Sequence, residues 1–207
     1  VRFSTSHPKD ISDEVIYTMA VYENICRHIH LPVQSGSSIM LEKMRRKYNR
    51  EWYLERVEKI RSVIPDCGIT TDVIAGFCGE TEQDHKDTLT LMEEVVFDSA
   101  FMFAYSERPG TQALKIEYKV TPQEKHRRSE RLLALSDAKQ RAFYERHIGK
   151  EAVVLLEKPK AGQPFHGFTD NYIKVEVDDA RARDNALVRV RLGEFNEDGT
   201  ALVATMI

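Results

Sequence analysis

The sequence predicts an α/β protein in which a helix-wound parallel sheet is followed by a small all-β barrel. From residue 2 to residue 148, short apolar runs alternate with longer amphipathic segments, a strand-then-helix rhythm typical of parallel sheets. After Gly149 the apolar segments are short and no helical segment separates them, as in small antiparallel barrels. We therefore expect two domains, over residues 1–149 and 150–207.

The first domain should contain four strand-and-helix units. We expect its strands over residues 2–6, 28–33, 69–75 and 101–105. Its helices are expected over 13–26, 39–47 with 50–63, 82–96 and 122–148. Right-handed crossovers would set successive strands side by side. Because four strands cannot close into a barrel, either the sheet stays open or strands are missing.

Two of these helices have clear starting signals. Thr81 can cap the helix that follows it, with Asp84 in the capping-box position. Thr121 can cap the last helix, since Pro122 suits the first helical position and Glu124 completes the box. The residues between 75 and Thr81 then form a tight turn, at the strand end where α/β folds bind ligands.

The second domain should be a barrel of short strands. We expect them over residues 152–156, 172–177, 186–192 and 201–205. The segments between them are rich in glycine, proline, asparagine and aspartate, which favour turns.

The composition is that of an ordinary globular protein, with 42% hydrophobic residues, 30% charged residues and a net charge of −3. RNA binding through overall positive charge is excluded, so any RNA contact must come from local patches. No apolar stretch is long enough to span a bilayer, and no signal peptide is visible. Val1 begins inside an expected strand, which suggests the later part of a longer protein.

The three cysteines, Cys26, Cys67 and Cys78, have the spacing of neither a zinc pair nor an iron–sulfur cluster triad. An odd number without a disulfide framework suggests a reducing compartment, so we expect a cytoplasmic protein with buried free thiols. Three histidines also lack a Cys, Asp or Glu at metal-ligand spacing: His7, His28 and His30.

Polar residues follow every expected strand of the first domain, at positions 4–8, 34–37, 76 and 105–110. Since the carboxyl ends of parallel strands lie at one edge, hydroxyls, an amide and glycines should form one concave polar rim. Turn formation alone would explain one such end, but four aligned ends favour a binding site.

Asp72 lies inside an apolar strand, so its carboxylate needs a partner. That partner is either a ligand hydroxyl or amine, or a structural hydrogen bond from a neighbouring strand.

Residues 43–50 carry five positive charges and no acid. Such a run is usually a solvated face. Here one arginine could turn inward toward a carboxylate or phosphate while the others face an anionic partner.

Four motifs together resemble the radical S-adenosylmethionine methylthiotransferases. They are His30-Leu-Pro-Val-Gln-Ser-Gly-Ser37, Met44-Arg-Arg-Lys-Tyr48, Asp72-Val-Ile-Ala-Gly-Phe-Cys-Gly-Glu-Thr81 and Tyr105-Ser-Glu-Arg-Pro-Gly-Thr111. The last two are similar to the branch that acts on isopentenyladenosine beside the tRNA anticodon. The resemblance covers essentially the whole chain. It implies the last four strands of a partial (β/α)6 barrel, followed by an RNA-binding β-barrel called the TRAM domain.

The resemblance also implies a reaction. In this family a 4Fe-4S cluster reduces S-adenosylmethionine, and the deoxyadenosyl radical takes hydrogen from carbon two of the adenine. A second 4Fe-4S cluster supplies sulfur, and another S-adenosylmethionine supplies the methyl group. The implied partners are the tRNA anticodon stem-loop and an electron donor such as flavodoxin or ferredoxin, with no membrane.

This sequence departs from the family in one respect. The Cys-x-x-x-Cys-x-x-Cys motif and the amino-terminal cysteines of the family are absent. We therefore expect the chain to hold neither cluster, to supply no catalytic or metal-ligating residue and to be inactive alone.

The matching positions imply roles for individual residues. The S-adenosylmethionine site should be lined by Ser6, Gln34, Ser35, Arg46, Asp72 and Gly76. Arg46 would pair with the carboxylate of the cofactor, while Asp72 and Gly76 border its ribose and adenine. The target base should enter at the last strand end, beside Ser106, Arg108 and Pro109.

The barrel is not basic as a whole, because residues 146–207 hold nine Lys/Arg and ten Asp/Glu. RNA contact is therefore expected from one face, whose candidate residues are Lys158, Lys160, Phe165, Arg181, Arg183 and Arg189. A base could stack on Phe165 while cations meet phosphates. The alternative is a solvated surface with Phe165 in the barrel core.

Other functions stay open. A methylthiotransferase of the same family could act on a ribosomal-protein aspartate or on threonylcarbamoyladenosine. The chain could also be a non-catalytic RNA-binding module. An ordinary metabolic barrel without metal is disfavoured by the TRAM-like tail.

Overall fold

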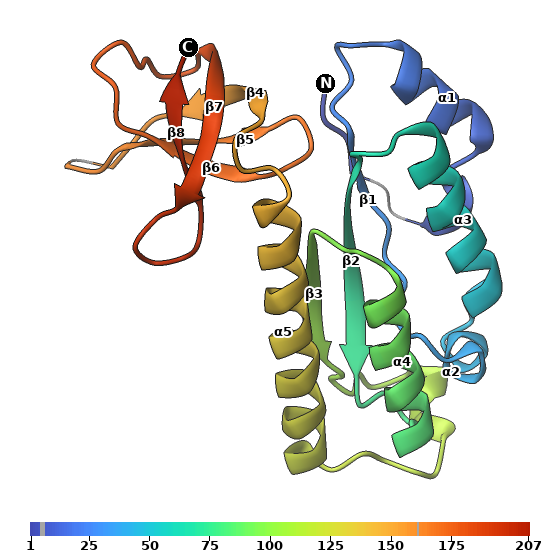
Figure 1. Ribbon diagram of the computed structural model, residues 1–207. Coiled ribbons are helices and arrows are strands. Elements are labelled where there is room, and N and C mark those ends of the chain that lie inside the picture. The colour runs from blue at the N-terminus through green and yellow to red at the C-terminus, as the bar shows by residue number, and fades with distance from the viewer. Residues whose placement is uncertain (5–6, 161) are drawn as a thin grey trace.

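The computed structural model describes residues 1–4, 7–160 and 162–207. It has two parts, a three-stranded parallel sheet surrounded by helices and a closed five-stranded barrel (Figure 1). Helix α5 (Pro122–Glu145) runs beside the sheet, antiparallel to its strands, and leads into the barrel. The α/β class expected from the sequence is therefore confirmed.

The sheet has the strand order β1-β2-β3, with bounds His28–His30, Gly68–Ala75 and Ser99–Ala104. Both neighbouring pairs are parallel. The helices before α5 are η1 (Pro8–Asp10), α1 (Asp13–Val21), α2 (Ser38–Lys43), α3 (Arg50–Val63), α4 (Glu82–Glu94) and η2 (Gln112–Lys115). Among the described residues, none of the helices has the length and apolar character that a bilayer crossing requires.

The strand expected over residues 2–6 is wrong for the part that the structure describes, because residues 2–4 form no strand. The backbone there is used elsewhere: the carbonyl of Val1 accepts from the N–H of Cys26 at 2.8 Å. Alternation of side chains indicates a strand only when a ladder partner is present, and here the sheet supplies none. The described sheet therefore has three strands rather than four.

Both predicted helix caps form. Thr81 accepts from the N–H of Asp84, and the reciprocal bond of the capping box is present. Thr121 accepts from the N–H of Glu124. The Glu124 carboxylate does not close the expected box, because it binds Arg127 and Arg128 instead.

The two faces of the sheet have different surroundings. On β2, Ile69 and Val73 are fully buried in the main apolar core together with side chains of α1, α3 and α4. The alternate residue Asp72 is only half-buried, and Phe101 and Phe103 of β3 are 47% and 52% exposed. One face of the sheet thus packs on helices, whereas the other is open over β3.

The barrel consists of β4 (Glu151–Glu157), β5 (Phe165–Thr169), β6 (Lys174–Val177), β7 (Leu187–Phe195) and β8 (Leu202–Met206). It closes in the order β4-β5-β6-β8-β7, and its pairs are antiparallel except for the parallel pair β6–β8. β5 was missed by the sequence analysis because it has few apolar residues and a central glycine. Gly167 is required there, since a Cβ would lie 2.2 Å from the carbonyl oxygen of Leu155.

The end of α5 belongs to the core of the barrel. Phe143 and Tyr144 are buried among the inward-facing side chains of the strands. The Tyr144 hydroxyl accepts from the N–H of Lys174 at 3.0 Å, and its ring stacks on Phe195. Helix and barrel therefore share one apolar cluster across the expected boundary at 149/150.

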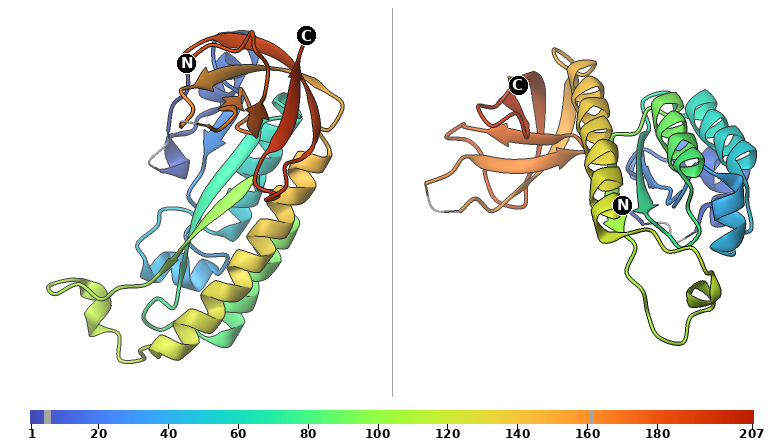
Figure 2. Two further views of the ribbon diagram at one scale, coloured as in Figure 1. Left: turned by 90° about the vertical axis from the view of Figure 1, so that its left-hand side faces the viewer. Right: turned by 90° about the horizontal axis from the view of Figure 1, so that it is seen from below.

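The turn between β5 and β6 connects the barrel to the sheet. Tyr172 has a φ of +76° and stacks between His28 and Phe168, at centroid distances of 4.5 and 4.7 Å. Arg2 donates to the carbonyl of Thr169 at 2.8 Å, and its guanidinium lies over the Tyr172 ring. Figure 2 shows the barrel at one end of α5 and the segment around η2 projecting near the opposite end.

Candidate functional site

The carboxyl ends of the three strands meet at one end of the molecule, where β2 points in Figure 1. Gln34 extends the edge of the sheet there. Its N–H donates to the carbonyl of Asp72 at 2.8 Å, and its own carbonyl accepts from Ile74 at 2.9 Å. Gln34 has a φ of +72°, in the left-handed region that non-glycine residues rarely adopt. Two backbone hydrogen bonds to β2 thus hold Gln34 at the rim.

A chain of polar side chains runs along the open face of the sheet. His28 Nε2 lies 3.1 Å from the Thr70 hydroxyl, and His30 Nδ1 lies 3.0 Å from the same hydroxyl. His30 Nε2 lies 3.5 Å from Oδ2 of Asp72. The chain therefore passes from the contact with the barrel to the half-buried Asp72.

The chain ends at a carboxylate. The ring of His30 lies between the Thr70 hydroxyl, to which it is hydrogen-bonded, and the Asp72 carboxylate, which it meets at 3.5 Å. This contact helps to orient the side chain of Asp72. The structure supplies a protein partner for Asp72 without closing it to solvent, since its side chain is 26% exposed.

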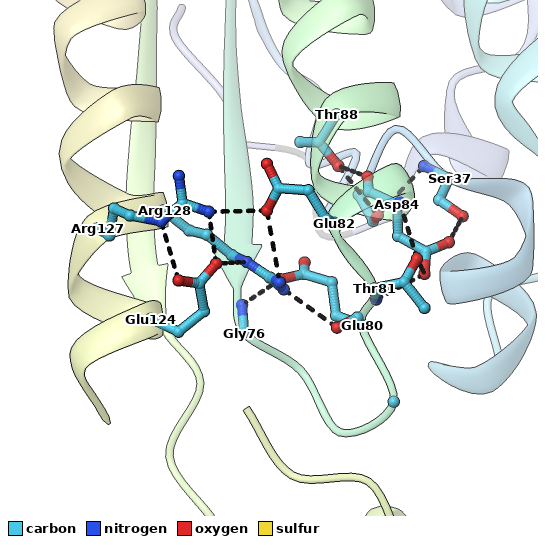
Figure 3. Close-up of polar contacts among 12 residues, drawn as sticks. Ser37, Gly76, Glu80, Thr81, Glu82, Asp84, Thr88, Glu124, Arg127 and Arg128 are labelled. Atoms are coloured by element: carbon cyan, nitrogen blue, oxygen red, sulfur yellow. Dashed lines mark hydrogen bonds and ion pairs between the residues drawn. The ribbon is translucent and has the colours of Figure 1, made fainter. Parts of the chain in front are cut away.

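The Gly76 turn is held by a buried ion pair (Figure 3). The N–H of Gly76 donates to Oε2 of Glu80 at 2.8 Å, and the same oxygen accepts from Arg128 at 2.6 Å. Glu80 and Arg128 are 1% and 2% exposed. Gly76 has a φ of +74°, and a Cβ there would lie 2.3 Å from Lys125 Cγ. The backbone N–H of Gly76 is therefore already hydrogen-bonded to Glu80. The turn contributes to the rim through its backbone shape rather than through this N–H.

The loop after Gln34 is fixed to α4. Ser35 is fully buried, with its hydroxyl 3.3 Å from that of Thr88. The Ser37 hydroxyl donates to Asp84 at 2.5 Å, as Figure 3 shows. A Cβ on Gly36 would lie 2.4 Å from the carbonyl oxygen of Asp87. The structure therefore places Ser35 in the packing behind the rim rather than on it.

Arg46 lines a cavity of about 550 Å³ between the ends of α2 and α3, together with Tyr48 and Trp52. Its side chain has no hydrogen bond or ion pair with Gln34 or Asp72, both of which the structure describes. Ser6, the remaining residue expected at the cofactor, lies outside the described residues.

The residues expected to receive RNA have varied surroundings. Ser106, Arg108 and Pro109 are exposed in the segment after β3. Lys158 and Lys160 are exposed after β4, whereas Phe165 is half-buried and packs against the barrel core. The three arginines have partners within the protein, namely Asp179 for Arg181, the carbonyl of Ala180 for Arg183, and Glu151 for Arg189. Their role in RNA binding stays a prediction.

The described residues include no group of three or more His, Cys, Asp or Glu side chains that could hold a metal ion. Cys67 and Cys78 are buried at opposite ends of β2, which has eight residues and so spans about 26 Å. These cysteines do not fit an iron–sulfur cluster. On the open face, Asp72 lies opposite the exposed Phe101 in the register of β2 and β3, so a hydrogen-bond acceptor and an aromatic ring are neighbours there.

Acid should destabilise the protein through His28. Burial, followed by the charges of Arg2 and His30, lowers the pKa of His28 to about 4. Below its ordinary pKa of about 6.5, the unfolded chain takes up a proton that the folded protein refuses. The free energy of unfolding should thus fall by roughly 3 kcal/mol between pH 6.5 and pH 4 from this group.

Urea unfolding of the wild type and of His28→Gln at several pH values would measure this effect. The variant should lose less stability on acidification. His85, whose pKa burial also lowers to about 4, contributes equally to both proteins and cancels in the comparison. Identical pH profiles would show that His28 does not remain neutral.

Comparisons with known proteins bear on this site. The model of the Radical SAM superfamily matches residues 1–92. The tRNA-2-methylthio-N(6)-dimethylallyladenosine synthase of Bacteroides fragilis is 48% identical over 197 residues, which cover 94% of this chain and 43% of that protein. The protein of the same name from Chlorobaculum tepidum is 45% identical over 204 residues, which cover 98% of this chain and 44% of that protein.

A solved structure shares the fold. Coproporphyrinogen III oxidase (HemN) from Escherichia coli, described as a radical SAM enzyme, matches with a TM-score of 0.55 at 14% sequence identity. The match covers 100% of this chain and 50% of that one.

The chain spans less than half the length of the curated relatives it matches, but the similarity runs along nearly all of its own length. Two of the motifs that suggested the family contain the rim residues Gln34, Asp72 and Gly76. This chain belongs to the radical SAM methylthiotransferase family.

Proposed function

We propose that this chain is part of an enzyme that adds a methylthio group to tRNA, at carbon two of an isopentenyl-adenosine beside the anticodon. The names of the curated relatives support the reaction and the RNA. The structural observation that carries the proposal is the polar chain from His28 to Asp72, which orients an accessible carboxylate at the rim.

On this proposal Asp72 and Gln34 hold S-adenosylmethionine. Asp72 accepts from its ribose hydroxyls or its ammonium group, and the face beside Phe101 receives the adenine. When bound, S-adenosylmethionine supplies the radical chemistry and the methyl group. His30 and Thr70 act as positioning residues, because they fix the orientation of Asp72 without a ligand contact of their own.

The two 4Fe-4S clusters that the family implies would be held by residues that this chain does not contain, so the chain alone would be inactive. The target base would enter beside Ser106 and Arg108. We assign residues 150–207 to a TRAM-like RNA-binding domain that follows the domain of residues 1–149 and shares the end of α5 with it. A cytoplasmic location and an electron donor such as flavodoxin or ferredoxin complete the proposal.

The role of Asp72 is tested by calorimetric measurement of S-adenosylhomocysteine binding to the complete protein. Asp72→Asn should weaken binding by about tenfold or more, because a hydrogen bond to a charged group contributes about 1.5–3 kcal/mol. Asp137→Asn, on an exposed position of α5, is the matched control and should bind like the wild type. Unchanged affinity in Asp72→Asn would remove Asp72 from the site.

Mass analysis of tRNA nucleosides from a deletion strain tests the substrate. The strain should retain isopentenyl-adenosine and lose its 2-methylthio derivative. Loss of a methylthio group from threonylcarbamoyladenosine or from a ribosomal-protein aspartate would instead indicate another branch of the family.

A further inference from the structure

The basic run at 43–50 divides into two groups. Lys43 donates to the carbonyl of Gly79 at 3.1 Å, and Arg50 binds the carbonyl of Gly36 at 3.2 Å and Glu94 at 3.0 Å. These two cations hold the fold together. The other three are Arg45, Arg46 and Lys47, which have no ion pair or side-chain hydrogen bond with any residue that the structure describes.

The backbone presents these three cations on a constrained turn. α2 ends at Lys43, and Arg45 follows with a φ of +58°, a conformation that costs a non-glycine residue about 1–2 kcal/mol. The turn is fixed by bonds from the N–H of Arg45 to the carbonyl of Glu42 and from the N–H of Arg46 to that of Leu41, both 2.8 Å. Arg45 and Lys47 are exposed, and Arg46 is half-buried.

A cavity of about 550 Å³ lies beside this turn. Arg46 and Lys47 line it, together with the ring of Trp52, and the carboxylate of Glu42 is the acidic group on its wall. An aromatic side chain and two cations on the wall of one cavity suit a nucleotide, because the base can stack while the phosphate meets the cations. The field of Arg46 and Lys47 reaches His7, whose pKa is lowered first by burial and then by charges that include both.

The position of the turn favours RNA over other anions. α2 lies at the end of the sheet toward which β2 points, the same end as the rim (Figure 1). An RNA that delivers a base to the rim has its flanking phosphates within reach of this end of the protein.

We propose that the turn Arg45–Lys47 and the cavity beside it bind the phosphate backbone of the RNA substrate, with a nucleotide against Trp52. This inference rests on the proposed function for its partner. It adds an RNA contact on the α/β part of the chain, apart from the barrel.

The first test is the salt dependence of binding to a fluorescein-labelled anticodon stem-loop RNA, measured by anisotropy. The double variant Arg45→Ala, Lys47→Ala removes two cations whose side chains have no hydrogen bond or ion pair with a described residue. It should bind several-fold more weakly, and the slope of log affinity against log salt should fall by about 1.4, which is about 0.7 for each lost phosphate contact. The single variant Lys86→Ala, at an exposed position of α4, should keep the wild-type slope and affinity.

The second test uses the intrinsic fluorescence of Trp52, since the chain contains one tryptophan. Addition of the stem-loop RNA should quench this fluorescence in the wild type and in Lys86→Ala. In Arg45→Ala, Lys47→Ala the quenching should require a several-fold higher RNA concentration.

Wild-type slope and affinity in the double variant, or Trp52 fluorescence that bound RNA leaves unchanged, would overturn this inference and leave the proposed function standing. Heparin that binds as tightly as the RNA and quenches Trp52 equally would also overturn it, by showing a general polyanion surface. If the wild type binds no RNA, both the inference and the RNA part of the proposed function fail.

Discussion

Replacing Arg128 with alanine should lower the free energy of unfolding by about 3–5 kcal/mol, the usual cost of stranding one partner of a buried ion pair. Arg128 is 2% exposed and Glu80 is 1% exposed. The Arg128 guanidinium donates to both the carboxylate and the backbone carbonyl of Glu80. Burial raises the pKa of Glu80 more than Arg128 and the Gly76 N–H lower it. The hydrogen bonds from Arg128 thus offset part of the cost of burying this carboxylate, and removing Arg128 leaves that cost uncompensated.

A second substitution shows whether the stability lost in Arg128→Ala comes from the unpaired charge of Glu80 or from lost packing. Glu80→Gln in the Arg128→Ala background removes the charge and keeps an acceptor for Gly76, so it should restore part of the loss. Arg131→Ala is the surface control, since Arg131 pairs with Glu82 while 41% exposed, and it should cost at most about 1 kcal/mol. Chemical denaturation measures all four proteins. A loss below 1 kcal/mol for Arg128→Ala would contradict the expectation.

Phe143→Ala should cost about 3–5 kcal/mol, the range for removing a fully buried aromatic ring. Phe143 is 1% exposed and lies in the apolar cluster of the barrel, although it belongs to α5. The loss should appear in the unfolding of the barrel itself, followed by amide exchange of β4 and β7. Leu133→Ala, on the same helix but 45% exposed, should cost far less.

The same contact predicts how the barrel behaves when it is isolated. A fragment that begins at residue 150 lacks Phe143 and Tyr144, so it should not fold. A fragment that begins at Pro122 keeps both and should fold. A stable barrel from residue 150 would show that α5 is not part of its core.

The sequence indicated most of the helices because their caps and apolar periods are local signals. It erred where an element depends on a distant partner. Residues 2–4 alternate like a strand, but the backbone at Val1 pairs with Cys26. β5 shows little apolar pattern and forms because β4 and β6 provide ladders on both sides.

The site was predictable in position but not in detail. Strand ends meet at one edge, so Gln34 and Asp72 could be placed together from topology. Sequence could not show that Ser35 turns to Thr88 or that Arg46 lines a cavity between the ends of α2 and α3, because those directions follow from tertiary packing. His30 was set aside for lack of a metal-ligand spacing, and its contacts with Thr70 and Asp72 cross between strands.

Helix α5 has 24 residues and is thus about 36 Å long. Near its first turn Arg128 binds the Gly76 turn, and at its last turn Phe143 sits inside the barrel. If α5 tilted by about 10° about one end, its other end would move by about 6 Å over this length. A tilt of this size would have to break the contacts that join the barrel to the sheet, namely the stacking of Tyr172 on His28 and the hydrogen bond from Arg2 to Thr169.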